Sequence, residues 1–283
     1  MTCRWKDLAA KRILRLGGSA SRGLCARRGK PYAESIARAS DRFQSILNNV
    51  DFRMSHNGER RVARIASESG VDCVFDIGAH VGDYSAMIAG IAPSCVIHAF
   101  EILPENFAVL ERNLASNRNI RLNAFGLSDA DGELEIAVGD SRDTATAFPL
   151  YTEHPGAYSS ARSVTCTVRK AADYVRSLSI DRIDLVKIDV EGMDLAVIRG
   201  FEDELARVRI IQFEYGLFNI LSRDLLADFY SYLTSRGFRV GKIFPRIVSF
   251  ASYDHTMENF LPSNYLAVRS GEGALIARLE QYG

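Results

Sequence analysis

The stretch from Val71 to Glu101 constrains the fold of this chain more than any other part of the sequence. A short apolar run, typical of a strand buried on both faces, carries the pattern D-x-G-x-x-x-G, which begins at Asp76. Residues 83–91 then have a helical pattern, and residues 96–100 form a second apolar run that ends at Glu101. This order predicts a β-α-β unit whose glycine turn and final carboxylate meet at one edge of a parallel sheet.

The details of the turn distinguish between possible nucleoside ligands. A carboxylate placed like Glu101 can accept two hydrogen bonds from the cis-diol of a ribose. Dinucleotide sites need a second glycine that admits the pyrophosphate, and here that position is His80. Gly78 and Gly82 let the chain turn and let a ligand approach the backbone. S-adenosylmethionine therefore fits better than NAD, with its methionine end near Asp76. A plain crossover turn without a ligand is the alternative.

Charge is unevenly distributed although the 283-residue chain has a formal net charge of zero. Residues 1–30 contain nine Lys or Arg and one acidic residue, which gives +8 and leaves −8 for the remainder. A mildly acidic body argues against nucleic acid as a partner. The basic segment suits a solvated extension, a peripheral membrane or docking arm, or a transit peptide, and the sequence leaves these open.

Cysteine usage indicates a reducing compartment. The five cysteines are odd in number and contain no C-x-x-C pair, which argues against a disulfide framework and a structural zinc site. We therefore expect a cytoplasmic protein. No apolar run approaches the ~18 residues of a membrane span.

Alternating strand and helix patterns over the rest of the chain predict a doubly wound, Rossmann-like α/β fold. We expect a basic extension and helix over residues 1–55, the main domain over 56–271 and a short helix or tail over 272–283. The strands are expected at residues 71–77, 96–100, 120–125, 133–138, 163–168, 183–190, 208–213, 238–244 and 265–268. The helices are expected at residues 32–50, 59–69, 83–91, 104–117, 170–178, 193–199 and 225–233.

Carboxylates stand at the ends of four predicted strands, and parallel strands bring their ends to one edge. They are Asp76, Glu101, Asp189 and Glu214. Asp189 could hold the methionine amine or take the proton from an attacking hydroxyl, and Glu191 could take that proton or orient the substrate. We also expect a catalytic contribution from Glu214. In the alternative interpretation, Lys187 simply pairs with Asp189, and Glu191 only interacts with a helix dipole.

Two further segments are candidates for the same edge. The turn of Gly126, Leu127, Ser128 and Asp129 follows the third predicted strand. Residues 139–162 form a long polar segment, which suits either a substrate-facing loop or a surface insertion. Carboxylates at this edge could also bind Mg²⁺, but we expect no metal requirement.

The chain resembles FkbM-type methyltransferases between about residues 59 and 269. The resemblance is carried by the following motifs: VFDIGAHVGDYS (74–85), HAFEILPENFAVLERNL (98–114), GLSDADGELEI (126–136), DLVKIDVEGMDLAVIRGF (184–201), IIQFEY (210–215) and NYLAV (264–268). It implies a seven-stranded, mostly parallel sheet whose last strand is antiparallel, and an N-terminal helical extension outside the family region.

The resemblance also implies a cofactor site and an activity. The expected S-adenosylmethionine contacts are Asp76, Gly78, Ala79, His80, Gly82, Glu101, Ile102, Gly126, Leu127, Ser128 and Asp189. Family members resemble enzymes that methylate hydroxyls of sugars or secondary metabolites, so the expected partner is a hydroxyl-bearing small molecule or glycan. One departure is Ala172, where the family often has an acid. An NAD-dependent oxidoreductase and a non-catalytic binding module are the alternatives, and the oligomeric state is left open.

Overall fold

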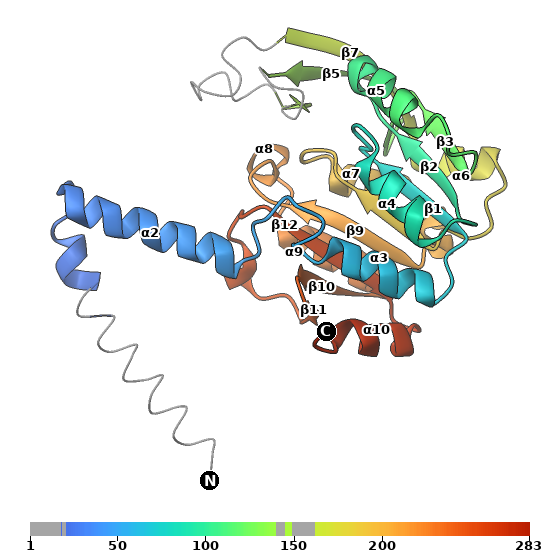
Figure 1. The fold of residues 1–283 in the computed structure, drawn as a ribbon. Helices are drawn as coiled ribbons and strands as arrows, with labels where there is room; N and C mark the ends of the chain where they lie inside the picture. Colours follow the sequence, from blue (N-terminus) through green and yellow to red (C-terminus); the bar gives the residue numbers. More distant parts are fainter. Residues whose placement is uncertain (1–17, 19–20, 140–144, 149–161) are drawn as a thin grey trace. The chain divides into compact units, whose positions relative to one another are not determined.

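The computed structural model describes residues 18, 21–139, 145–148 and 162–283 (Figure 1). The chain forms two compact units, Met1–Asn48 and Asn49–Gly283. The first unit contains α2 (Pro31–Leu47), which begins at a proline because its fixed φ suits the first helical turn. No helix among the described residues is long and apolar enough to cross a membrane.

The second unit is built on a large, mostly parallel sheet. Among the described residues its eight strands have the order β11-β10-β12-β9-β8-β1-β2-β3. Six strands run in one direction, while β12 and β11 are antiparallel to their neighbours. The strands are β1 (Cys73–Ile77), β2 (Val96–Phe100), β3 (Ile120–Asn123), β8 (Leu185–Ile188), β9 (Ile210–Tyr215), β10 (Phe238–Phe244), β11 (Ile247–Phe250) and β12 (Ser263–Arg269). The predicted mostly parallel α/β fold is confirmed.

The sheet has one strand more than the seven that we expected. The additional strand is β11, whose Ile247 pairs with Phe244 of β10 across a turn made of Pro245 and Arg246. A proline has the φ that the first turn position requires, so this hairpin forms directly after β10. Only four residues long, β11 is too short for its alternation to stand out in the sequence.

Helices cover both faces of this sheet, as expected of a doubly wound fold (Figure 1). On one face lie α3 (Glu59–Glu68), α4 (Asp83–Ile91), α5 (Pro104–Leu114) and α10 (Gly273–Glu280). On the other lie α6 (Ala171–Ser177), α7 (Asp194–Gly200), η2 (Glu202–Arg207) and α9 (Leu226–Ser235). Short helices α8 (Asn219–Ser222) and η3 (His255–Met257) occupy connections. Successive strand residues enter opposite cores: Val74 packs with α3, and Phe75 packs with α6.

In the part of the chain that the structure describes, a second sheet has four strands. Its order is β4-β7-β5-β6, with β4 (Gly126–Ser128), β5 (Gly132–Val138), β6 (Ala145–Thr146) and β7 (Arg162–Lys170). Ile136 and Cys166 of this sheet pack against Leu103. Gly126–Ser128 is therefore a strand that pairs with β7, where we expected a turn. Residues 140–144 and 149–161 of the long polar segment lie outside the described residues.

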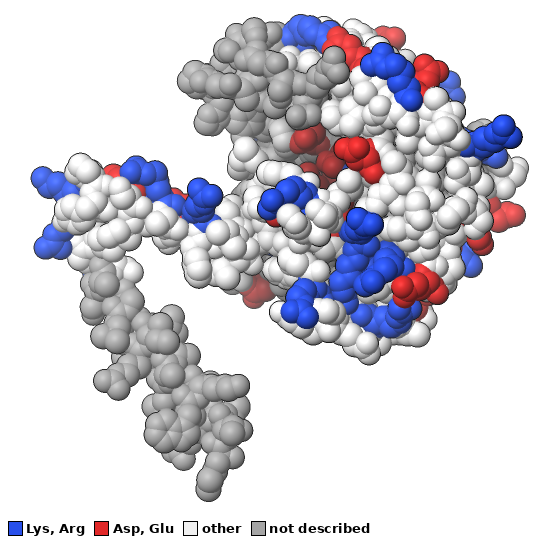
Figure 2. Space-filling view, in the orientation of Figure 1, with Lys and Arg blue, Asp and Glu red and all other residues white. Residues whose placement is uncertain are grey.

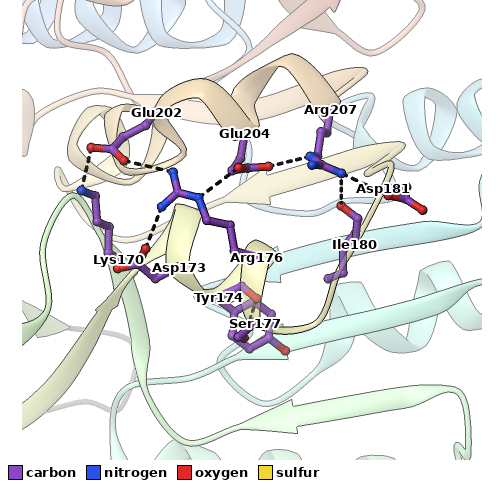
Figure 3. A network of polar contacts seen from close by, with 10 residues as sticks. All are labelled: Lys170, Asp173, Tyr174, Arg176, Ser177, Ile180, Asp181, Glu202, Glu204 and Arg207. Atoms are coloured by element: carbon purple, nitrogen blue, oxygen red, sulfur yellow. Dashed lines mark hydrogen bonds and ion pairs between the residues drawn. The ribbon is translucent and has the colours of Figure 1, made fainter.

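Charged side chains connect neighbouring elements on the surface. Arg176 of α6 bonds Glu204 at 3.0 Å and Asp173 at 2.8 Å, and Lys170 pairs with Glu202 (Figure 3). Such exposed pairs contribute only ~0–1 kcal/mol each, so they orient η2 against α6 without dominating stability.

Figure 2 shows another group of Lys and Arg side chains over α3 and α10. There Arg61 donates to the carbonyl oxygen of Gln281 at 2.7 Å.

Candidate active site

Four strand ends bring the predicted carboxylates to one edge of the large sheet. β2, β1, β8 and β9 are consecutive and parallel, and they carry Glu101, Asp76, Asp189 and Glu214 at or just beyond their carboxyl ends. In the β1–β8 register Asp76 lies opposite Lys187. The convergence expected from a parallel sheet is therefore present.

Glu101 lies directly against the glycine turn. Its Oε2 accepts the backbone N–H of His80 at 2.8 Å, and its Oε1 accepts that of Leu103 at 2.8 Å. The side chain is 5% exposed, and this burial raises the pKa of Glu101 to about 7. The Asn106 side chain also donates a hydrogen bond to Glu101. A carboxylate has about four acceptor positions, so acceptor capacity remains for a ligand. The turn and the distal carboxylate thus form one unit that can receive a diol.

The backbone amides of the turn are largely used within the protein. Gly78 and Ala79 donate to the carbonyl oxygen of Phe100 at 3.0 and 2.8 Å, and Gly82 donates to that of Ala79 at 2.8 Å. With the His80 amide on Glu101, these four N–H groups have protein acceptors. These four N–H groups are therefore not free for a ligand. A ligand at the turn would contact its surface and the neighbouring carboxylates instead.

The two glycines of the turn have a packing role that the sequence did not reveal. A Cβ on Gly78, whose φ is +82°, would stand 1.9 Å from the carbonyl oxygen of Asp189. A Cβ on Gly82, whose φ is +95°, would stand 2.8 Å from a methyl carbon of Leu110. Protein atoms therefore fill the space that we expected the glycines to keep open for a ligand. The glycines let β8 and α5 approach the turn.

Gly78→Ala is expected to lower the free energy of unfolding substantially, by more than the ~1–3 kcal/mol of backbone strain alone, because its Cβ also meets backbone atoms. Gly90→Ala in α4 is the matched control. A Cβ at Gly90 meets nothing within 4 Å, so this change should stabilise the helix by about 0.5–1 kcal/mol. Urea unfolding of both variants measures the difference, and equal stabilities would refute this role of Gly78.

Asp76 has one carboxylate oxygen in use and one without a partner. Oδ2 accepts the Ser85 hydroxyl at 2.7 Å, while the buried Oδ1 has no hydrogen-bond partner among the described residues. The side chain is fully buried, which raises the pKa of Asp76 even though the Lys187 charge opposes this. Buried acceptors normally have a donor, so Oδ1 is suited to a ligand N–H or an ordered water.

Beyond β8, Asp189 is held as the anion of a carboxylate cluster. Lys187 Nζ lies 2.9 Å from Asp189 Oδ2. Burial opposes ionisation of Asp189, but the Lys187 charge and hydrogen bonds from Lys187 and Glu214 hold its pKa below the ordinary value. Burial and the charges of Asp189 and Glu191 raise the pKa of Glu214 well above its usual range. Asp189 is thus the charged member of this pair and Glu214 the protonated one.

Glu191 has the properties of a poised proton acceptor. Burial, with the charges of Asp189 and Asp194, raises its pKa to about 8. Its φ is +53°, which is uncommon for a residue with a side chain and characteristic of functional sites. A Cβ on the following Gly192 would stand 3.0 Å from the ring of Phe148 and 2.9 Å from Phe218. Phe148 and Phe218 therefore pack against Gly192 at this end of the cluster.

Asp194 is a member of the cluster that the sequence analysis missed. Its Oδ1 accepts the backbone N–H of Glu214 at 3.1 Å, and burial raises its pKa to about 7. It stands in the first turn of α7, where an acidic residue is ordinary, so its type and position gave no distinct signal. The only available signal was its closeness to Asp189 in the motif DVEGMD.

The remaining predicted cofactor residues lie next to this unit. Ile102 is half-buried, and its Cδ1 would be 3.0 Å from a Cβ on Gly126. Leu127 and Ser128 follow in β4 and are both buried. Ala172 lies in the first turn of α6 and is fully buried. Among the described residues, no group of three or more His, Cys, Asp or Glu side chains could hold a metal ion.

Comparison with known proteins gives a family match over most of this site. The model of the methyltransferase FkbM domain matches residues 76–240. Methyltransferase sdnD of Sordaria araneosa is 29% identical over 157 residues, which is 46% of this chain and 61% of that protein. The 2-O-methyltransferase NoeI of Sinorhizobium fredii is 24% identical, covering 50% of this chain and 63% of that protein. The hexuronic acid methyltransferase AglP of Haloferax volcanii is 26% identical, covering 54% and 61%. The chain thus spans less than two thirds of the length of each relative.

Proposed function

Since this chain belongs to the FkbM methyltransferase family, we propose that it transfers a methyl group from S-adenosylmethionine to a hydroxyl, on a sugar in a glycan, glycolipid or secondary metabolite. The observation that carries the proposal is the contact between Glu101 and the turn. The His80 N–H on Glu101 Oε2 joins, at 2.8 Å, the two features that a nucleoside site requires.

In this proposal, three carboxylates would bind the cofactor. Glu101 would accept the ribose hydroxyls with the acceptor capacity that His80, Leu103 and Asn106 leave. Asp189, kept anionic by Lys187, faces the positively charged methionine amine, and Asp76 offers its unpartnered Oδ1 to the same end. When bound, S-adenosylmethionine supplies a methyl group on a sulfonium sulfur, which becomes a neutral thioether as the acceptor oxygen bonds to the methyl carbon.

The acceptor hydroxyl has to lose its proton as its oxygen gains the methyl group. We assign this proton to Glu191, because a general base works best when its pKa is close to the working pH. The pKa of Glu191 is raised to about 8, first by burial and then by the Asp189 and Asp194 charges. Phe148 and Phe218 pack against Gly192, next to this carboxylate.

The names of two relatives support the proposed acceptor. NoeI is a 2-O-methyltransferase and AglP is a hexuronic acid methyltransferase. Membership of the family weighs against the NAD-dependent oxidoreductase considered above. Free thiols at Cys25, Cys73, Cys95 and Cys166 support the proposed cytoplasmic location.

Calorimetric titration with S-adenosylhomocysteine, the product that keeps the whole nucleoside and amino acid, tests the proposal. We expect saturable one-to-one binding, and no heat with NAD at the same concentration. Absence of binding at millimolar S-adenosylhomocysteine, with the protein shown to be folded, would reject the proposed cofactor.

The affinity for S-adenosylhomocysteine is expected to increase as the pH rises from about 6 to about 8. The ionised form of Glu101 accepts the ribose hydroxyls better, and burial places its pKa at about 7. Below that pKa, each pH unit should cost up to about tenfold in affinity. Asp189 has a lowered pKa and stays ionised over this range, so it adds no slope.

Glu191 and Asp194 also titrate near this range, so a control variant is needed. Glu101→Gln removes only the Glu101 titration, and the difference in slope between wild type and this variant isolates its contribution. The same slope in both proteins would contradict an ionisable contact at Glu101.

A further inference from the structure

Lys187 belongs to a buried polar row that crosses three strands. In the registers of the sheet, Asp76 of β1 lies opposite Lys187 of β8, which lies opposite Gln212 of β9. All three side chains are buried, on the face covered by α3 and α4. Gln212 continues the row by donating to Glu59 of α3 at 2.7 Å. A lysine in such a position has to have compensating charges to stay ionised.

Carboxylates from three elements supply that compensation. Burial alone would lower the pKa of Lys187, but the charges of Asp189, Asp76 and Glu59 raise it above its ordinary value. Tyr84 of α4 also faces it, with the ammonium 5.3 Å from the ring centre. The charge of Lys187 also acts on Glu191, Asp194 and Glu214. Lys187 is therefore a permanent cation inside the protein.

The ion pair between Lys187 and Asp189 connects this interior to the candidate active site. The Lys187 side chain is 8% exposed and the Asp189 side chain 42% exposed, and Nζ and Oδ2 are 2.9 Å apart. Oδ2 of Asp189 thus contacts the buried Lys187 ammonium, while the Asp189 carboxylate is partly exposed at the edge of the sheet. The titratable groups that interact with Asp189 besides Lys187 are Glu214, Glu191, Asp194, Asp76 and His80.

We propose that Lys187 is a positioning residue for methyl transfer, which holds Asp189 as an anion with a fixed orientation toward the methionine amine of the cofactor. The role of Lys187 in methyl transfer rests on the proposed function, whereas the ion pair between Lys187 and Asp189 does not depend on it. Without Lys187, the crowded carboxylates at this edge would share protons, and Asp189 would lose the charge that attracts the amine.

The test is a pH titration of the side-chain carboxyl carbons by NMR in protein labelled with ¹³C-aspartate. The Asp189 signal is identified as the one missing from Asp189→Asn. In the wild type its midpoint should lie below the ~3.9 of an unperturbed aspartate. In Lys187→Met it should rise by about 1–3 pH units, as expected when an adjacent opposite charge is lost. Lys187→Arg, which keeps the charge, should restore a midpoint close to that of the wild type.

Arg209→Met is the matched structural control. Arg209 has the same 8% side-chain exposure as Lys187 and forms an ion pair with Glu272 at 2.8 Å. It precedes β9, at the opposite edge of the sheet, so its loss should destabilise the protein without moving the Asp189 midpoint. An equal shift in both Met variants would indicate a general structural effect and overturn the proposal.

Three further results keep this proposal testable and separate it from the proposed function. If Lys187→Met does not fold, an Asp189 midpoint at or above the ordinary value in the wild type overturns the proposal. If the wild type binds S-adenosylhomocysteine, Lys187→Met should bind it at least tenfold more weakly at low pH and recover as the pH rises, whereas an unchanged affinity ratio overturns the positioning role. If the wild type binds no S-adenosylhomocysteine, the cofactor proposal fails, and the NMR result still decides whether Lys187 holds Asp189 ionised.

Discussion

Replacement of Glu191 by glutamine is expected to reduce kcat for methyl transfer by about 10²–10⁴-fold, the usual contribution of a general base. Glutamine is close to glutamate in size but cannot take a proton from the acceptor. The affinity for S-adenosylhomocysteine should change little, because Asp76, Glu101 and Asp189 carry the cofactor contacts. The measurement is transfer of labelled methyl groups from S-adenosylmethionine to a panel of methyl glycosides.

Glu133→Gln is the control for this variant, since Glu133 is an exposed carboxylate on β5. Its kcat should equal that of the wild type. A Glu191→Gln enzyme that retains wild-type turnover would remove Glu191 from the mechanism. A loss of turnover that only parallels a loss of folded protein would assign Glu191 a structural role.

Replacement of Glu101 by glutamine is expected to weaken S-adenosylhomocysteine binding by about 10–150-fold. This corresponds to the ~1.5–3 kcal/mol of a hydrogen bond to a charged group. The amide group would also face one of the two backbone donors, His80 N–H or Leu103 N–H, and so disturb the turn. Calorimetry gives the change in affinity, and thermal unfolding shows whether the fold survives.

Glu105→Gln is the matched control, because Glu105 lies in the first turn of α5 and is exposed. Its ion pair with Arg162 is on the surface, so its loss should leave the affinity unchanged. Comparable losses in both variants would mean that charge near this edge matters and that Glu101 has no specific contact.

The sequence predicted the β-α-β unit well because each of its features has a local cause. The apolar runs of β1 and β2 fill both cores, and the observed bounds of α4 and β2 are those expected. Proline at the start of α5 and glycine after α9 marked helix ends for the same reason. The resemblance to FkbM-type methyltransferases is confirmed by the family match over residues 76–240.

Features that depend on distant packing could not be predicted. The need for glycine at Gly78 comes from the backbone at Asp189, which is more than a hundred residues away in the chain. Gly126–Ser128 became a strand because it pairs with β7, beyond the long polar segment. Asp194 looked like an ordinary helix-start charge, and its burial against β9 decides its role. The roles assigned to individual site residues stay predictions.

A crystal structure of the protein with S-adenosylhomocysteine is the most direct test of where the cofactor binds. We expect the ribose hydroxyls on the carboxylate of Glu101 and the amino group between Asp76 and Asp189. The same ligand bound elsewhere, with Glu101 contacting only the amides of His80 and Leu103, would contradict it.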